Sequence, residues 1–151
     1  MSDLDRLRHS CAHVLATAIS RIWPEAQFAA GPPVEGGFYY DFDLEHRITP
    51  DDYEDIEAEM KKVVKENVPF ERMVVSRDEA TALAKSGRLA SVAERDVESV
   101  FKVDLLNDIP EDEEISIYKN GDFWDLCAGP HVGRTGNCKA FKIMSVASAF
   151  Y

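Results

Sequence analysis

The sequence contains no stretch that could act as a membrane anchor, a secretion signal or a disulfide framework. Although 45% of its 151 residues are apolar, no run approaches the roughly 18 consecutive apolar residues that a membrane-spanning helix needs. The opening Met-Ser-Asp-Leu-Asp-Arg lacks the basic region followed by an apolar region that marks a secretory signal. The cysteines number only three and sit in polar or motif-like surroundings, which argues against disulfides. We therefore expect a globular domain in the reducing cytoplasm.

Basic residues are also scarce, with 17 Lys and Arg against 28 Asp and Glu, which gives a formal net charge of -11. This balance is unfavourable for a nucleic-acid-binding protein, because contacts with phosphate need a basic surface. Much of the acidic charge is concentrated at 51–59 and 108–114, where it is typical of solvated surface. The charge alone predicts weak RNA binding, to which a larger parent protein contributes. Basic residues nevertheless flank the motifs described below: Arg6, Arg8, Arg134, Lys139 and Lys142.

No internal repeat or low-complexity segment divides the chain, so we expect one domain over residues 1–151. Helices are predicted at 4–23, at 49–67 and at 76–87. Pro24 ends the first, Thr49 and Pro50 start the second, and a capping box of Ser76 and Glu79 starts the third. Residues 88–107 also have a helical pattern, with breaks that the sequence does not place.

Short strands are predicted at 27–30, 38–42, 70–75 and 141–151, and a hairpin at 115–126 has Asn120-Gly121 as its tight turn. The pattern predicts an α+β fold, in which a mainly antiparallel sheet carries helices on one face and the long N-terminal helix flanks a cleft. Because the chain ends within apolar, strand-like sequence, we expect it to be a fragment of a longer protein.

Two histidines, His9 and His13, are four residues apart and therefore project from one face of the first helix. Their mean direction is roughly opposite the apolar stripe of that helix, and small side chains lie beside them. This predicts a face that lies away from the main core and that another group approaches closely. The spacing alone is equally consistent with two surface histidines that have no role.

A second motif, Cys127-Ala-Gly-Pro-His131, follows a predicted strand. Glycine allows a close approach of the backbone to a ligand, and proline limits the freedom of the loop. Three histidines and a cysteine are ligand types that zinc prefers, although this spacing is not diagnostic. A structural zinc, a catalytic zinc and a metal-free site in which histidines move protons all remain open.

Three blocks now occur in order: Arg-His-Ser-Cys-Ala-His at 8–13, Gly-Phe-Tyr-Tyr-Asp at 37–41 after Gly31-Pro32, and Asp-Leu-Cys-Ala-Gly-Pro-His at 125–131. Together they resemble the editing domain, or second additional domain, of bacterial-type threonyl-tRNA synthetase. The paired histidine and cysteine motifs recur in the editing domain of alanyl-tRNA synthetase and its free-standing relatives. The Gly-Phe-Tyr-Tyr-Asp block favours the threonyl kind, and the resemblance spans essentially the whole chain.

The resemblance implies hydrolysis of the ester that joins serine to threonine tRNA. A synthetic site rejects serine poorly, because the loss of one methyl group is worth only about 1–3 kcal/mol. The implied partners are the 3′ end of tRNA(Thr) carrying serine and the rest of the synthetase. Nothing in the chain resembles an ATP-binding or amino-acid-activating core, so this part removes an amino acid and does not attach one.

The resemblance also implies residue roles. His9 is the best candidate to position or activate the attacking water, with His13 in support. Cys127, His131 and Asp125 line the opposite wall of the site.

Further roles follow from the same resemblance. Lys102 is expected near the substrate carbonyl, where a cation stabilises an oxyanion. Tyr40 is expected to close over the amino acid or the adenine, and Gly129 and Pro130 are expected to bind substrate. The family commonly has a basic residue at the position of Ala128, which puts one contact to the tRNA end or to a carboxylate in doubt.

The threonyl kind resembles a site that works without metal, whereas the alanyl relatives bind zinc. We therefore expect no cofactor; if zinc is bound, its ligands are His9, His13, Cys127 and His131. The alternatives are a zinc-dependent deacylase of the alanyl kind, a tRNA-docking module without catalysis, and a structural zinc module.

Several conspicuous residues are predicted to have only packing or surface roles. His46 is expected on a surface loop. Cys11 is expected in the core and Cys138 partly buried, with no partner at metal spacing. Trp23 and Trp124 are expected to pack at the core or its edge.

Overall fold

The computed structural model describes residues 3–29, 33–34, 37–38, 40–127 and 135–138. Its helices are α1 (Asp3–Ile22), α2 (Pro50–Glu66), α3 (Arg77–Lys85), α4 (Val100–Asp108) and the 3-10 turn η1 (Thr135–Asn137). Its strands are β1 (Gln27–Phe28), β2 (Pro33–Val34), β3 (Gly37–Phe38), β4 (Phe42–Asp43), β5 (Phe70–Val75), β6 (Ile115–Asn120) and β7 (Phe123–Leu126). The strands form a three-stranded sheet in the order β5-β6-β7 and two short ladders, β1-β4 and β2-β3, all antiparallel. The α+β prediction is confirmed.

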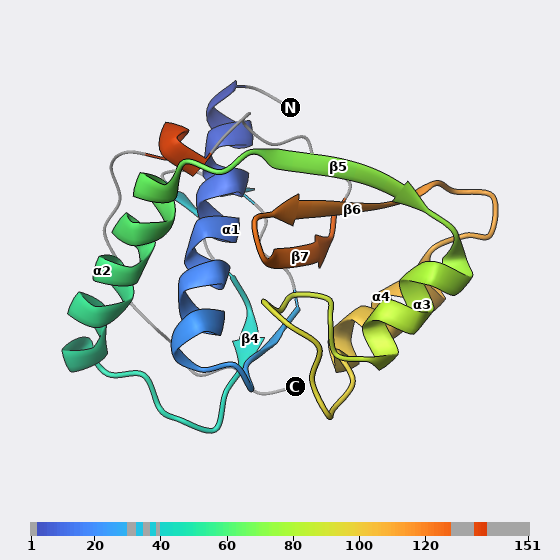
Figure 1. Cartoon of the computed structure of the whole chain (residues 1–151), viewed down its shortest axis with the longest axis horizontal. Helices are drawn as coiled ribbons and strands as arrows, with labels where there is room; N and C mark the ends of the chain where they lie inside the picture. Colours follow the sequence, from blue (N-terminus) through green and yellow to red (C-terminus); the bar gives the residue numbers. More distant parts are fainter. Residues whose placement is uncertain (1–2, 30–32, 35–36, 39, 128–134, 139–151) are drawn as a thin grey trace.

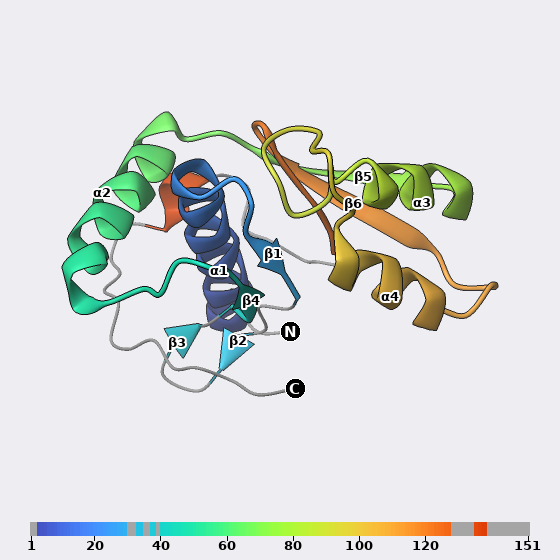
Figure 2. The same ribbon diagram turned by 90° about the horizontal axis from the view of Figure 1, so that it is seen from below.

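Helix α1 lies in the middle of the molecule, between α2 and the three-stranded sheet (Figures 1 and 2). From Ser10 to Ser20 every residue of α1 except Leu15 is buried. The apolar stripe of α1 packs against Ile56, Met60 and Val63 of α2. Helix α1 therefore packs against both the helical half and the sheet half of the fold.

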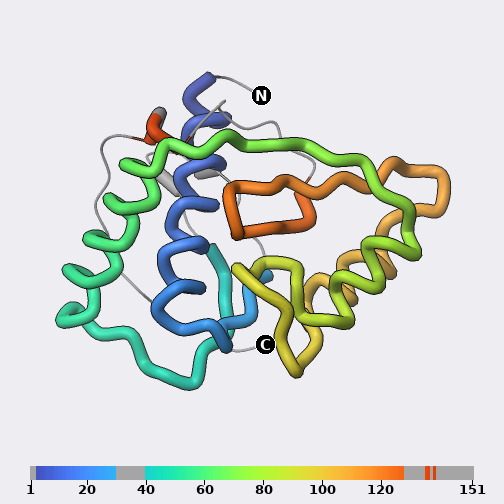
Figure 3. Tube along the Cα trace, in the orientation of Figure 1, coloured from blue at the N-terminus to red at the C-terminus, as the bar shows by residue number. Residues whose placement is uncertain are grey.

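Helices α3 and α4 pack on one face of the three-stranded sheet and lie at the end of the molecule farthest from α2 (Figure 2). Their core contains Ala84, Leu106, Ile115 and Ile117. Strand β5 connects the two halves, because the chain passes through it from the end of α2 to the start of α3 (Figure 3). Among the described residues, no helix is both long and apolar enough to cross a membrane.

The boundary signals of the first three helices are confirmed. The backbone N–H of Thr49 donates to Asp52 Oδ2 at 2.9 Å, which caps α2. Asn67 ends α2 in the left-handed region, with a φ of 51°. The Ser76 hydroxyl accepts the backbone N–H of Glu79 at 3.1 Å, as the capping box predicts.

The helical prediction for 88–107 is wrong over residues 88–99, which are irregular. Gly87, with a φ of 72°, and Ala90, with a φ of 53°, turn the chain out of helical geometry. Polar side chains then bond to carbonyl groups across the segment: Arg95 Nε donates to Gly87 O at 2.7 Å, and Ser99 Oγ donates to Leu89 O at 2.7 Å. These tertiary contacts outweigh the local helical preference.

Two strand predictions also need correction. The strand expected at 38–42 is divided between β3 and β4, with Tyr40 in neither. The hairpin turn is Gly121-Asp122 instead of Asn120-Gly121, because Asn120 pairs with Phe123. Of the turn residues, Gly121 alone takes a positive φ, of 60°. The strand predicted at 141–151 lies outside the described residues.

Candidate functional site

The register of the hairpin determines which side chains face α1. Side chains alternate along β7, so Phe123 and Asp125 share one face and Trp124 and Leu126 share the other. Trp124 and Leu126 pack toward α3 and α4, whereas Phe123 joins the core formed by α1. Asp125 therefore points toward α1. By the same alternation, Cys127, two residues later, lies on the same side.

His9 and His13 meet this face of the sheet from α1. Their rings are T-shaped with centroids 5.5 Å apart. The centroids of Phe123 and Phe70 lie 6.0 and 6.4 Å from that of His13. His13 is only 2% exposed, so the expectation that the histidine face lies away from the core is wrong for this residue. The sheet supplies a second apolar wall that the periodicity of α1 cannot reveal.

Cys127 lies directly beside His9, with its Sγ 3.5 Å from His9 Nε2. Ser116 of β6 fixes the cysteine through two hydrogen bonds: its hydroxyl donates to Cys127 O at 2.7 Å, and its carbonyl accepts Cys127 N–H at 3.2 Å. The structure thus brings the two predicted motifs together. The predicted site residues Gly129, Pro130 and His131, with Ala128, lie outside the described residues.

Asp125 is the centre of a buried polar network and is 0% exposed. The Tyr40 hydroxyl donates to its Oδ2 at 2.5 Å, and the Leu126 N–H donates to its Oδ1 at 2.8 Å. Lys102 Nζ lies 3.1 Å from Oδ1, and His13 Nε2 lies 3.9 Å from Oδ2. Three other predicted site residues, Tyr40, Lys102 and His13, therefore converge on this carboxylate.

Lys102 reaches this network from the first turn of α4 and is 2% exposed. Its ammonium group also donates to Ala29 O at 2.8 Å. A buried ammonium group and a buried carboxylate each carry a large desolvation cost, which their mutual attraction offsets. The Lys102–Asp125 pair consequently ties α4 to β7 beneath the two histidines.

Burial controls the protonation of the site. Burial lowers the pKa of His9, although the negative charge of Asp125 acts in the opposite direction and raises it. It lowers the pKa of His13 well below its ordinary value, with further lowering from His9 and Lys102. Burial and then Asp125 hold the pKa of Tyr40 well above its ordinary value, so its phenol keeps the proton that it donates. At neutral pH the site therefore contains neutral imidazoles, which can accept a proton.

The donor set also fits a metal ion in residue type. The candidate ligand atoms of His9, His13 and Cys127 lie within 4.8 Å of one another. Two imidazole nitrogens and a thiolate are ligands that zinc accepts. These three residues would hold such an ion, with His131 as the predicted fourth ligand.

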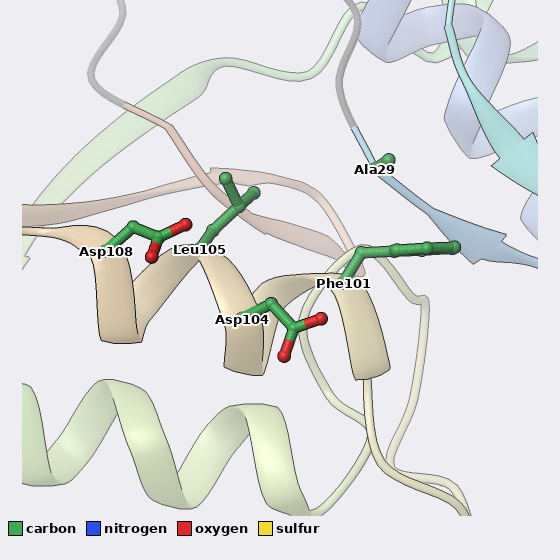
Figure 4. A pocket seen from close by; sticks show the side chains of 5 residues that line it. All are labelled: Ala29, Phe101, Asp104, Leu105 and Asp108. Carbon is green, nitrogen blue, oxygen red and sulfur yellow. The ribbon is translucent and has the colours of Figure 1, made fainter. Parts of the chain in front are cut away.

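Two hollows of the described surface lie away from this cluster. One, of about 200 Å³, is lined by Ala29, Phe101, Asp104, Leu105 and Asp108 (Figure 4). Another, of about 380 Å³, is lined by Arg21, Lys62, Lys65 and Glu66. Neither contains a predicted site residue, so the site is identified by its chemistry and not by concavity.

Sequence reasoning missed Ser116, Phe70 and Phe123 as neighbours of the site. Phe123 could have been found, because it alternates with Asp125 in a strand that was predicted. Ser116 and Phe70 lie on other strands, and they become neighbours only once the pairing register is known.

The residues expected to have packing or surface roles are placed as follows. His46 is exposed, stacks on Trp23 with ring centroids 4.9 Å apart, and lies 3.0 Å from Asp52 Oδ2. Cys11 is buried, as expected. Cys138 is only 1% exposed instead of partly buried, and its pKa is raised by the Cys11 thiol and by burial.

Sequence comparison relates this arrangement to a known family. Residues 115–149, which include β6, β7 and the cysteine motif, match the family described as the threonyl and alanyl tRNA synthetase second additional domain. The chain resembles this family, as its three motif blocks predicted.

Its relatives are of the threonyl kind. The chain is 48% identical over 147 residues to the threonine–tRNA ligase of Carboxydothermus hydrogenoformans, with 97% of this chain and 22% of that protein covered. It is 50% identical over 144 residues to the ligase of Clostridioides difficile, with 95% and 21% covered. It is 47% identical over 148 residues to the ligase of Geobacillus kaustophilus, with 98% and 21% covered. The chain thus spans about a fifth of the length of these relatives.

Proposed function

We propose that this chain hydrolyses the aminoacyl ester of mischarged seryl-tRNA(Thr), as the editing part of a threonyl-tRNA synthetase. The observation that supports this most directly is the contact between His9 Nε2 and Cys127 Sγ, at 3.5 Å. This contact joins a proton acceptor to the motif loop that the resemblance assigns to substrate binding. The proposed partners are the tRNA 3′ end and the rest of the synthetase.

In the proposed reaction His9 accepts a proton from a water molecule. The water oxygen attacks the ester carbonyl, and the carbonyl electrons move onto its oxygen. The tetrahedral intermediate then collapses, breaking the bond to the ribose oxygen of the terminal adenosine, which takes up the proton. The products are free serine and uncharged tRNA. His9 suits this role because it is half-buried and its lowered pKa keeps it neutral near pH 7.

Lys102 and Asp125 support this chemistry in different ways. Among the residues that the structure describes, the Lys102 ammonium group contacts Asp125 and Ala29, so its third N–H donor is the one we assign to the developing oxyanion. Asp125 fixes the ammonium group and lies near His13. The buried position of Tyr40 and its bond to Asp125 favour a positioning role for this residue over one of covering the substrate.

We further propose that the reaction needs no metal. A zinc ion held by His9, His13 and Cys127 would supply a bound water of lowered pKa. The metal-capable donor set makes a zinc-dependent deacylase of the alanyl kind the second candidate. The 46–50% identity to threonine–tRNA ligases favours the first.

The test is to incubate the chain with seryl-tRNA(Thr), threonyl-tRNA(Thr) and seryl-tRNA(Ala) and to follow release of the amino acid. We expect release of serine from the first substrate only. H9A should abolish most of this release, whereas the matched variant H46A, at an exposed histidine outside the site, should retain it. Absence of hydrolysis with an excess of every substrate would reject the enzymatic proposal for this chain. Full activity in H9A would exclude His9 as the proton acceptor.

A further inference from the structure

An arginine of the sheet, Arg72, lies near the site although nothing in the sequence points to it. In the sheet, Arg72 of β5 is the cross-strand partner of Tyr118 of β6, and Tyr118 is the partner of Asp125 of β7. Cross-strand partners share a face, so the three side chains form a row on the face that meets α1. Phe70, two residues before Arg72 on the same face, contacts the ring of His13.

Arg6 approaches the same place from α1. It precedes His9 by three residues and His13 by seven, so the three residues share one helix face. Arg6 therefore continues the line of histidines toward the start of the helix. It is half-buried, and its Nε has almost no contact with solvent.

The charges of both arginines act on one phenol, that of Tyr118. The pKa of Tyr118 is raised by burial and by Cys127, and the charges of Arg72 and Arg6 act against this rise. The effect of both cations on one buried side chain agrees with the positions given by the sheet register and the helix spacing.

The positive charges of Arg6 and Arg72 are poorly neutralised by the residues that the structure describes. Arg72 Nη2 lies 3.1 Å from Glu114 Oε2, but the side chains are 41% and 59% exposed, so this ion pair is weak. Arg6 forms no ion pair with any of the residues that the structure describes.

We propose that Arg6 and Arg72 form a phosphate-binding pair that holds a backbone phosphate of the substrate RNA beside the hydrolytic site. The proposal rests on the proposed function and names a contact that would position the RNA end. Guanidinium groups bind phosphate oxygens through two parallel hydrogen bonds. The exposed Glu114 competes with phosphate for the guanidinium group of Arg72.

The first test measures binding of a short single-stranded RNA that ends in cytidine-cytidine-adenosine, by fluorescence anisotropy over a range of salt concentrations. R6Q and R72Q should each weaken binding several-fold and reduce the salt slope by about 0.7, the value for one lost phosphate contact on a single strand. E114Q should strengthen binding, because it frees Arg72. The matched control K85Q, at an exposed lysine of α3, should change neither quantity.

The second test compares hydrolysis of seryl-tRNA(Thr) with that of seryl-adenosine, which has no phosphate. R72Q should lower the ratio of kcat/KM for the tRNA to that for the nucleoside at least fivefold, and K85Q should leave the ratio unchanged. An unchanged ratio in R72Q, or RNA binding by R6Q and R72Q as tight as that of the unaltered chain, overturns the proposal. If the unaltered chain hydrolyses neither substrate, the proposed function fails, while the binding test still decides on the phosphate pair.

Discussion

Lys102 Nζ lies 3.1 Å from Asp125 Oδ1, and the two side chains are only 3% and 1% exposed. Residues from α4 and β7 thus form an ion pair that is closed to water. Such a pair holds structure only while both charges are present, because either one alone would be a buried, uncompensated charge. The network beneath the histidines is therefore a structural element as well as a part of the proposed site.

Removal of one charge should destabilise the fold strongly. D125N keeps the shape of the side chain but leaves the Lys102 ammonium group without a counter-charge. We expect the free energy of unfolding in urea to fall by about 3–5 kcal/mol. The double variant D125N/K102M should recover much of this loss, because no buried charge remains. Equal urea midpoints for D125N and the unaltered chain would show that the pair has no structural role.

The buried His13 should make stability depend on pH. Its pKa in the fold is well below 6.5, whereas in the unfolded chain it returns to about 6.5. Below pH 6.5 the unfolded state therefore binds more protons than the folded state, and stability falls as the pH falls. We expect a lower urea midpoint at pH 5.5 than at pH 7.5, measured with chelator present. H13Q should show a smaller difference; the same difference in H13Q would assign the effect to other groups.

Metal removal distinguishes the two candidate mechanisms. If hydrolysis is metal-free, serine release should be equal after dialysis against a chelator and after addition of zinc. Elemental analysis of the purified chain should find less than one zinc per molecule. Loss of activity in chelator, restored by zinc and absent in C127S, would instead support the zinc-dependent reaction.

Two glycines with positive φ should differ in their tolerance of alanine. At Gly87, with a φ of 72°, an added Cβ would collide with the backbone oxygen of Val97. At Gly121, with a φ of 60°, the nearest atom to such a Cβ is a methyl group of Val68 at 3.7 Å. We expect G121A to cost about 1 kcal/mol from backbone strain alone and G87A clearly more. Thermal unfolding of both variants tests this; equal losses would mean that residues 95–97 move aside without cost.

The local parts of the fold were predictable because their signals are local. Thr49 and Asn67 mark the start and the end of α2, and Ser76 marks the start of α3. Each does so through hydrogen bonds to residues that are close in the sequence. Pro24 likewise follows the last turn of α1. The proximity of the histidine and cysteine motifs was also predictable, and the structure brings His9 and Cys127 into contact.

The remainder depended on contacts between distant segments. Periodicity placed His13 away from the core because it cannot show that Phe70 and Phe123 cover the other face of α1. Residues 88–99 are irregular because Arg95 and Ser99 bond to carbonyl groups that a local pattern does not contain. The sequence did not indicate a role for Arg72, since this residue becomes a neighbour of Tyr118 only when β5 and β6 pair.

The central position of α1 determines how the site would be lost. Amide hydrogens in an element buried on all sides exchange with solvent only through large openings of the structure, close to global unfolding. The amides of α1 between Ser10 and Ser20 should therefore be among the slowest to exchange. Because His13 lies in this segment and His9 directly precedes it, local fraying of other elements leaves the spacing of the two histidines intact.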